Sequence, residues 1–206
     1  MKILVSGAGI AGLACALEFG RRGHAVTVVE QARQLRLTGT PIDIRGDAIE
    51  VVEKMGLLPL IAARRIRMSE QTQFVDSRGE RIAPMPIAEI SDSDDDIEIL
   101  RADLVCILAD AVPDTVTIRF GEAITALTHG DTDIDVQFAS GRSARYDLVV
   151  GADGQHSATR RLVFGPDDQC LRHLGVYFAL AEILGEAQAD VPNSIYNVPG
   201  RMAGVF

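Results

Sequence analysis

The chain has 206 residues, of which 47% are hydrophobic and 24% are charged, and its formal net charge is -9 at pH 7. This composition is typical of a globular protein with one domain or slightly more, and it argues against a disordered tail. The negative charge disfavours non-specific binding to nucleic acid or anionic lipid, so we expect neither as a partner. No apolar run approaches the roughly 20 residues that span a bilayer. Because three glycines also interrupt the apolar start, we expect a cytoplasmic protein without a signal peptide.

The first thirty residues predict a βαβ unit. Residues 2–6 and 25–30 are short apolar stretches typical of buried strands. Residues 10–22 have the helical period, and Gly23 is placed to end that helix. Two parallel strands joined by one helix form a right-handed crossover, so we expect the chain to begin as a Rossmann-like α/β fold.

A glycine-rich turn lies between the first strand and the helix, and the second strand ends in Glu30. Its sequence fits G-x-G-x-x-G in the context that favours a dinucleotide site. The first glycine permits the tight turn, the second lets a pyrophosphate approach the backbone, and the third brings the helix close to the sheet. Glu30 can accept hydrogen bonds from ribose hydroxyls, and its charge disfavours a 2′-phosphate. The pattern predicts an adenine dinucleotide without separating FAD from NAD, held by Gly7, Gly9, Ile10, Ala11, Gly12 and Glu30.

The remaining elements follow from hydrophobic period and turn residues. An acidic stretch over residues 91–96 favours a solvated loop, with a metal site as the minor alternative. We expect helices over residues 43–55, 101–112 and 156–163, a hairpin from residues 72–75 and 81–83, and strands over 116–120, 123–127, 134–138, 146–150 and 175–183.

The cysteines and histidines predict neither a metal site nor a protein nucleophile. Cys15, Cys106 and Cys170 are far apart, and no Cys or His spacing suits zinc. Ser157 lacks the context of a nucleophile elbow. We therefore expect no metal and no catalytic side chain of this kind.

A second motif occurs at residues 147–160, where a predicted strand leads into Gly151-Ala152-Asp153-Gly154 and then Ser157 and Arg160. This segment resembles the second fingerprint of FAD-dependent monooxygenases of the p-hydroxybenzoate hydroxylase type, the group A aromatic hydroxylases. In that family the loop contributes to the binding of both the flavin and NAD(P)H. The resemblance implies that Asp153 and Gly154 contact the cofactor; the alternative is a plain strand–turn–helix corner.

Two further segments carry the same resemblance. Arg101, followed by Leu104, resembles the Arg-x-x-Leu segment whose arginine contacts the linker region of the cofactor; a surface salt bridge is the alternative. Residues 39–45 resemble the segment that passes beside the isoalloxazine ring, most closely in the tetracycline-modifying branch. Asp43 or Arg45 would then lie near the flavin, although Asp43 could equally cap the next helix.

Residues 175–183 resemble the first long strand of the family's substrate sheet. Leu180 stands where the tetracycline-modifying enzymes have an amide side chain, which makes tetracycline doubtful as a substrate. Together with Tyr177 and Phe178, Leu180 favours an aromatic or polyketide-like ligand.

The resemblance covers almost all of this chain but only the N-terminal half of the family, since the third fingerprint is absent from the sequence. We expect an α/β, Rossmann-like FAD/NAD(P)-binding fold with a parallel sheet and a β-meander, plus the beginning of a mixed substrate-domain sheet. Residues 1–170 would form the FAD-binding domain, with residues 68–100 contributing a hairpin to the substrate domain. Residues 171–206 would begin that truncated second domain, and the chain alone would bind FAD weakly.

The function implied by the resemblance is hydroxylation of an aromatic or polyketide-like small molecule. In such enzymes NAD(P)H reduces FAD, and molecular oxygen then forms a flavin hydroperoxide that transfers its distal oxygen to the substrate. The alternatives are an inactive or weakly nucleotide-binding fragment and another flavin oxidoreductase of the same fold, such as a halogenase or a prenyl reductase. The sequence does not indicate the oligomeric state.

Overall fold

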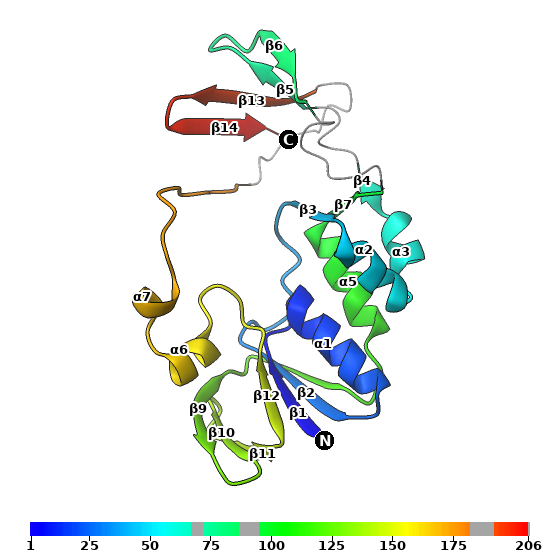
Figure 1. Cartoon of the computed structure of the whole chain (residues 1–206), viewed down its shortest axis with the longest axis vertical. Coiled ribbons are helices and arrows are strands. Elements are labelled where there is room, and N and C mark those ends of the chain that lie inside the picture. Colours follow the sequence, from blue (N-terminus) through cyan, green and yellow to red (C-terminus); the bar gives the residue numbers. More distant parts are fainter. Residues whose placement is uncertain (67–71, 87–94, 182–191, 206) are drawn as a thin grey trace. The chain divides into compact units, whose positions relative to one another are not determined.

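The computed structural model describes residues 1–66, 72–86, 95–181 and 192–205 (Figure 1). The chain divides into two compact units. Unit 1 contains Met1–Thr38 and Arg101–Phe178, and unit 2 contains Gly39–Leu100 and Ala179–Phe206. The predicted domain boundaries at residues 170 and 171 stay a prediction.

Unit 1 is built on a sheet of four parallel strands in the order β12-β1-β2-β8. Its two central strands, β1 (Lys2–Ser6) and β2 (Ala25–Glu30), are joined by helix α1 (Ile10–Arg21), while β12 (Leu148–Gly151) and β8 (Thr117–Phe120) flank them. The predicted βαβ unit is confirmed, and its two strands have the expected bounds. The parallel sheet confirms the Rossmann-like fold.

Helix α1 packs against helix α5 (Arg101–Ala111) within this unit (Figure 1). The apolar residues at helical spacing are the buried ones, among them Leu13 and Leu17 of α1 and Leu104 of α5. Gly23 takes a φ of +78°, which a residue with a side chain rarely adopts, so the predicted helix stop is confirmed.

A three-stranded antiparallel meander follows β8, with the order β11-β10-β9. Its strands are β9 (Ile124–His129), β10 (Ile134–Phe138) and β11 (Ser143–Tyr146). Strand β11 was not predicted, because residues 143–145 are mostly small or polar and Tyr146 was assigned to the strand that follows it. The break occurs at Asp147, whose carboxylate accepts a hydrogen bond of 2.7 Å from the backbone N–H of Lys2.

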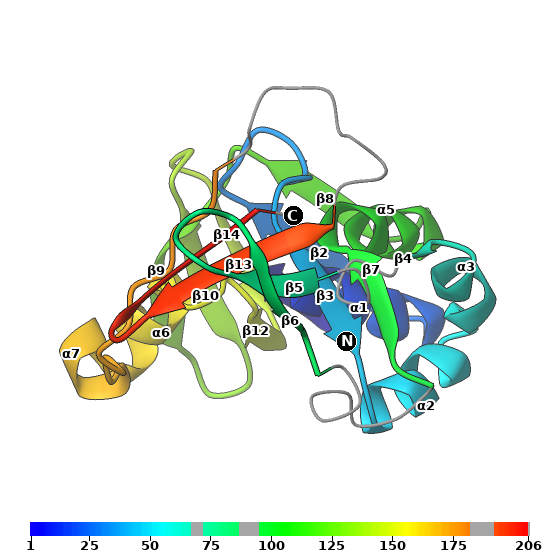
Figure 2. The same ribbon diagram turned by 90° about the horizontal axis from the view of Figure 1, so that it is seen from above.

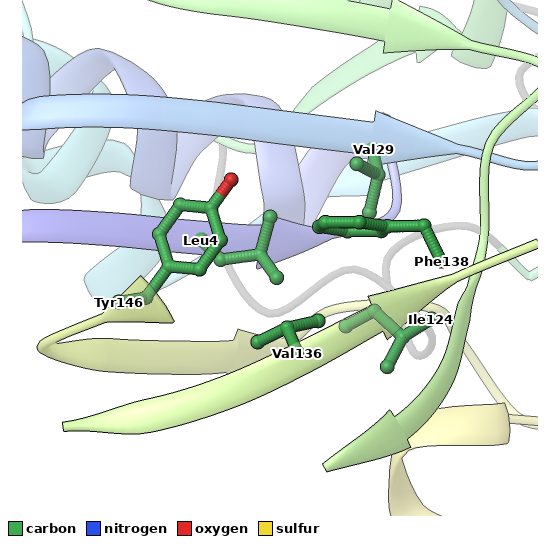
Figure 3. Packing of buried hydrophobic residues seen from close by; sticks show 6 residues of the cluster. All are labelled: Leu4, Val29, Ile124, Val136, Phe138 and Tyr146. Carbon is green, nitrogen blue, oxygen red and sulfur yellow. The ribbon is translucent and has the colours of Figure 1, made fainter. Parts of the chain in front are cut away.

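The meander buries its apolar face against the parallel sheet (Figure 3). Phe138 and Tyr146 meet edge to face with ring centroids 6.5 Å apart, a favourable arrangement of aromatic rings. The shared core fixes the position of β10 relative to the end of β2. Its buried members are Leu4, Val29, Ile124, Val136, Phe138 and Tyr146.

Unit 1 ends with helices α6 (Ala158–Phe164) and α7 (Asp167–Cys170) and an extended segment. The predicted strand over residues 175–183 is wrong in its described part, because residues 175–181 form no strand. Tyr177 is 90% exposed and Phe178 is 73% exposed. An apolar run becomes a strand only when another strand pairs with it. Residues 182 and 183 lie outside the described residues.

Unit 2 contains an antiparallel sheet in the order β3-β7-β4, formed by β3 (Pro41–Ile44), β7 (Ile97–Leu100) and β4 (Arg65–Ile66). Helices α2 (Asp47–Lys54) and α3 (Leu58–Ala62) belong to the same unit. Residues 43 and 44 were expected in a helix, but β3 pairs with β7 instead, with Ile44 opposite Ile97.

Helix α2 therefore begins later than predicted. Gly46, with a φ of +50°, is its N-cap residue. The suggestion that Asp43 caps this helix is wrong, because Asp43 lies inside β3 opposite Glu98. Gly56 has a φ of +69°, as expected for the residue that follows the end of the helix.

A second, mixed sheet in unit 2 has the order β14-β13-β5-β6 (Figure 2). The predicted hairpin is formed by β5 (Thr72–Val75) and β6 (Arg81–Pro84), which are antiparallel. Strand β13 (Asn193–Val198) pairs parallel with β5 and antiparallel with β14 (Arg201–Val205). This sheet confirms the expected beginning of a mixed sheet, although β13 rather than residues 175–181 lies beside β5.

Candidate nucleotide-binding site

The two sequence motifs meet at the carboxyl edge of the parallel sheet. Strand β1 ends at Ser6 directly opposite Gly151, the last residue of β12. The backbone N–H of Ala152 donates to the carbonyl of Ser6 over 2.8 Å, so the two glycine-rich turns are adjacent although they are far apart in the sequence. In open α/β sheets, ligands bind outside this edge.

Close backbone packing explains two of the three glycines in the first motif. Gly7 has a φ of +104°, and a Cβ atom there would come within 2.5 Å of the carbonyl oxygen of Ala152. A Cβ atom on Gly12 would come within 1.8 Å of the carbonyl oxygen of Gly7. Neither position has room for a side chain, because the nearest atoms belong to the backbone.

Gly9 differs from these two glycines because it faces open space. The nearest atom to a Cβ placed there is Nη2 of Arg101, at 3.9 Å. Gly9 also caps α1 without a side-chain hydrogen bond, and the first turn of the helix has no acidic residue. The first N–H groups of a helix lack intrahelical acceptors and attract anions. An anionic group therefore fits beside Gly9, between the N-terminus of α1 and Arg101.

Arg101 begins α5, and its guanidinium is held by a long hydrogen bond of 3.4 Å from Nη1 to the carbonyl oxygen of Thr38. The structure thus places Arg101 at the glycine loop and shows no salt bridge to it among the described residues. A planar guanidinium with spare donors suits a phosphate.

Glu30 already has two partners in the structure. Its Oε2 accepts a hydrogen bond of 2.9 Å from the backbone N–H of Ala8, and its Oε1 accepts one of 2.8 Å from Ala32. A carboxylate has about four acceptor positions, so each oxygen retains one for a ribose hydroxyl. Glu30 therefore braces the glycine loop, and it does so at the carboxyl end of β2. The sequence showed no sign of this bracing role.

Asp153 uses its carboxylate inside its own loop. Oδ1 accepts from the hydroxyl of Ser157 over 2.5 Å, and Oδ2 accepts from the backbone N–H of Thr159 over 2.9 Å. The Ser157 side chain in turn caps α6 by accepting from the N–H of Arg160. Gly154, with a φ of +81°, completes the turn. The carboxylate shapes this loop, and contact of Asp153 and Gly154 with a cofactor stays a prediction.

The hydrogen bonds keep Asp153 ionised. Burial alone would raise the pKa of this carboxyl, but the bonds from Ser157 and Thr159 outweigh burial and lower the pKa below its ordinary value of 3.8. A lowered folded-state pKa stabilises the fold above the unfolded pKa, and that contribution is lost as the pH falls through the folded value.

We expect the substitution Asp153→Asn to lower the free energy of unfolding by about 1–2 kcal/mol near neutral pH, because an amide cannot accept on both sides. The difference in the free energy of unfolding between Asp153→Asn and the unchanged protein should narrow as the pH falls below 3.8. Urea unfolding curves over this pH range measure both quantities. Asp114→Asn, at an exposed position, is the control. An unchanged free energy of unfolding for Asp153→Asn would contradict the bracing role.

A charged cluster that the sequence analysis missed braces the same loop from the other side. Arg160 donates to the carbonyl oxygen of Gln155 over 2.7 Å and to Asp167 over 2.5 Å. Arg161 donates to the carbonyl oxygen of His156 over 3.0 Å and also contacts Asp167. The hydrogen bond from Arg160 is the main reason that the pKa of Asp167 is lowered. The only sequence signal was a pair of arginines followed, after a Gly-Pro turn, by acids.

Asp43 and Arg45 form an ion pair in unit 2, with 2.8 Å between Oδ2 and Nη2. Nε of Arg45 lies 3.6 Å from Oδ2 of Asp96, which is only 8% exposed. The expected solvated loop over residues 91–96 is therefore wrong for Asp96, because its carboxylate lies beside Arg45. Residues 91–94 lie outside the described residues. Proximity of Asp43 and Arg45 to a flavin stays a prediction.

The structure thus brings together the predicted site residues of unit 1, namely the glycine loop, Glu30, Arg101 and the Asp153-Gly154 turn.

Within the described ranges, no three His, Cys, Asp or Glu side chains are grouped as metal ligands would be. None of the described helices has the length and apolar character needed to cross a membrane.

Comparison with known proteins identifies the ligand class of such a site. Residues 1–169 match the family model described as FAD binding domain. The chain belongs to this FAD-binding family. It is 36% identical over 195 residues to a flavin-dependent monooxygenase of Legionella longbeachae, covering 93% of this chain and 50% of the relative. It is 38% identical over 215 residues to the FAD-dependent monooxygenase asL6 of Sarocladium schorii, covering 93% of this chain and 51% of the relative.

Solved structures of FAD-binding monooxygenases have the same fold. The tetracycline destructase Tet(51) is 44% identical with a TM-score of 0.69, and the alignment covers 79% of this chain and 41% of that chain. The tetracycline destructase Tet(55) is 39% identical with a TM-score of 0.71, and the alignment covers 81% of this chain and 41% of that chain. The resemblance to the N-terminal half of FAD-dependent monooxygenases, near the tetracycline-modifying branch, is confirmed. The chain spans about half the length of the curated relatives it matches.

Proposed function

We propose that this FAD-binding chain serves an FAD-dependent monooxygenase that hydroxylates an aromatic or polyketide-like small molecule. NAD(P)H as the reductant, molecular oxygen as the second substrate and a cytoplasmic location belong to the same proposal. The observation that carries it is the open face of Gly9, which lies beside the N-terminus of α1 and 3.9 Å from Arg101 at the Cβ position. Because the chain belongs to the FAD-binding family, we infer that the pyrophosphate would bind at this place.

The residues around this place would set the orientation of the cofactor. The N-terminus of α1 and Arg101 would hold the phosphates, and Glu30 would accept from the hydroxyls of the adenosine ribose. The turn at Asp153 and Gly154 lies at the end of β12, on the other side of β1 from Glu30. The adenosine would therefore extend toward β2, and the flavin would lie on the side of β12.

The cofactor, when bound, supplies the redox and oxygen chemistry of the proposed reaction. The chain's own residues would bind and orient it. Asp153, Ser157 and Thr159 keep the second turn rigid through their hydrogen bonds, so that its backbone is fixed before the cofactor binds. A preorganised site loses less entropy on binding.

Titration with FAD, followed by the change in flavin fluorescence, tests the proposed site. We expect saturable binding that ADP displaces by competition, because under this proposal the two motifs would contact the ADP part of FAD. Displacement by riboflavin but not by ADP would contradict the assignment of the pyrophosphate and the ribose.

We expect Arg101→Ala to weaken ADP binding about tenfold, the usual effect of losing one charge-assisted hydrogen bond to a phosphate. The stability of the fold should change little, since the guanidinium makes, among the described residues, only the long bond to Thr38. Calorimetric titration with ADP gives the affinity, and a thermal melt gives the stability. Arg145→Ala, at a side chain that is 69% exposed on the meander, is the matched control and should bind ADP normally.

A further inference from the structure

Glu122 is a buried carboxylate for which the proposed function has no role so far. The residue is 6% exposed and lies between β8 and β9. Its Oε2 accepts a hydrogen bond of 2.5 Å from the Ser140 hydroxyl. Its Oε1 accepts from the backbone N–H of Ser140 over 3.1 Å and from that of Ala123 over 3.2 Å. Glu122 therefore fastens the connection between β8 and β9 to the turn between β10 and β11.

The backbone of the same connection holds the segment that follows β2. The N–H of Glu122 donates to the carbonyl oxygen of Glu30 over 3.0 Å. The N–H of Gly121 donates to the carbonyl oxygen of Ala32 over 2.9 Å. The segment from Glu30 to Ala32 thus lies against a connection that Glu122 fixes in place. Burying a polar side chain is favourable only when its hydrogen bonds are satisfied, and those of Glu122 are.

Ala32 holds one of the two oxygens of the Glu30 carboxylate. The N–H of Ala32 donates to Oε1 of Glu30 over 2.8 Å, while its carbonyl oxygen is held by Gly121. The core supports this arrangement, because Val29 and Phe138 belong to one buried cluster (Figure 3). Val29 directly precedes Glu30, and Phe138 lies two residues before Ser140.

We propose that Glu122 is a positioning residue for ribose recognition: by fastening residues 121–123 to Ser140, it holds Ala32 and thereby the carboxylate of Glu30. This inference rests on the proposed function, since it requires that Glu30 binds the ribose. It predicts a specific defect. Loss of Glu122 should weaken the interaction with the ribose hydroxyls and leave the phosphate contacts at Gly9 and Arg101 unchanged.

The test compares two ligands with several variants of the full chain. Calorimetric titration measures the affinity for ADP and for 2′,3′-dideoxyadenosine 5′-diphosphate, which lacks both ribose hydroxyls. We expect Glu122→Ala to weaken ADP binding about fivefold to tenfold, with the affinity for the dideoxy ligand unchanged. Ser140→Ala should weaken ADP binding about threefold and leave the affinity for the dideoxy ligand unchanged. Its effect is smaller because the two backbone hydrogen bonds to Glu122 remain. Asp135→Ala, which removes an exposed carboxylate from the same meander, should alter neither affinity.

The outcomes separate this inference from the proposed function. If Glu122→Ala and Ser140→Ala each lost as much affinity for the dideoxy ligand as for ADP, the substitutions would have loosened the whole nucleotide site. That result would overturn the positioning role. Unchanged affinity for both ligands would overturn it as well. If Glu122→Ala does not fold, Ser140→Ala decides by the same comparison. Failure of the unchanged protein to bind ADP would reject the nucleotide site itself, and with it this inference.

Discussion

Replacing Gly12 by alanine is expected to lower the free energy of unfolding by about 3 kcal/mol or more, one of the largest effects of a single substitution in this chain. The new Cβ atom would lie 1.8 Å from the carbonyl oxygen of Gly7, and that oxygen belongs to the backbone. Relief therefore requires α1 to move away from the turn that follows β1. A domain of this size has only about 5–15 kcal/mol of stability in total, so urea unfolding should show a clear shift of the midpoint.

Gly9→Ala is the matched control, because it adds the same methyl group three residues earlier in the motif without a clash. Gly9 has a φ of -81°, which alanine adopts readily, and the nearest atom to the new Cβ is 3.9 Å away. The stability should change by less than about 0.5 kcal/mol. The methyl group would instead occupy the approach of the phosphate, so ADP affinity should fall about tenfold or more. If both variants lost stability equally, the assignment of separate roles to the two glycines would fail.

The βαβ unit and its nucleotide motif were predictable because their signals are local. A short apolar strand, a glycine turn and a helix that ends at a glycine are neighbours in the sequence, and so the strands at 2–6 and 25–30 had the correct bounds. The roles of Gly7 and Gly12 also follow from local geometry. Even the adjacency of the second motif follows once β12 is recognised as parallel to β1.

The errors came from pairing between distant segments. The stretch that includes Asp43 has an apolar pattern that suits a helix, but β7 pairs with it as a strand. Tyr177 and Phe178 lie in an apolar run, but β13 takes the place beside β5. Hydrophobic period records which side of an element is apolar, and it does not record which partner completes a sheet.

Side chains that brace the site were the hardest to foresee. Glu122 follows a glycine at the end of a strand, where a charged residue is ordinarily exposed, and only the fold shows that Ser140 turns toward it. The hydrogen bonds of the Asp153 carboxylate within its own loop were equally hard to foresee. Its partners Ser157 and Thr159 come close to it only when α6 forms. The sequence thus indicated the ligand class, and the structure was needed to show how the loops are held.

Glu30→Ala is expected to weaken ADP binding about tenfold to a hundredfold, equivalent to about 1–3 kcal/mol. The substitution removes the acceptors that we propose for the ribose hydroxyls. It also leaves the N–H groups of Ala8 and Ala32 without the carboxylate that now accepts from both. The glycine loop then loses a brace, so part of the effect reaches the phosphates as well. Calorimetric titration with ADP measures the loss, and unchanged affinity would reject the assignment of Glu30 to the ribose.

Glu30→Gln separates the charge of this residue from its hydrogen bonds. The amide keeps one oxygen, which can accept from Ala8 or from Ala32, so the loss of ADP affinity should be smaller than for alanine. The negative charge is gone, and repulsion of a phosphate on the ribose is gone with it. We therefore expect the preference for ADP over its 2′-phosphorylated analogue to narrow in Glu30→Gln, as measured by the ratio of the two dissociation constants. An unchanged ratio would mean that a group other than the Glu30 carboxylate discriminates between the two ribose forms.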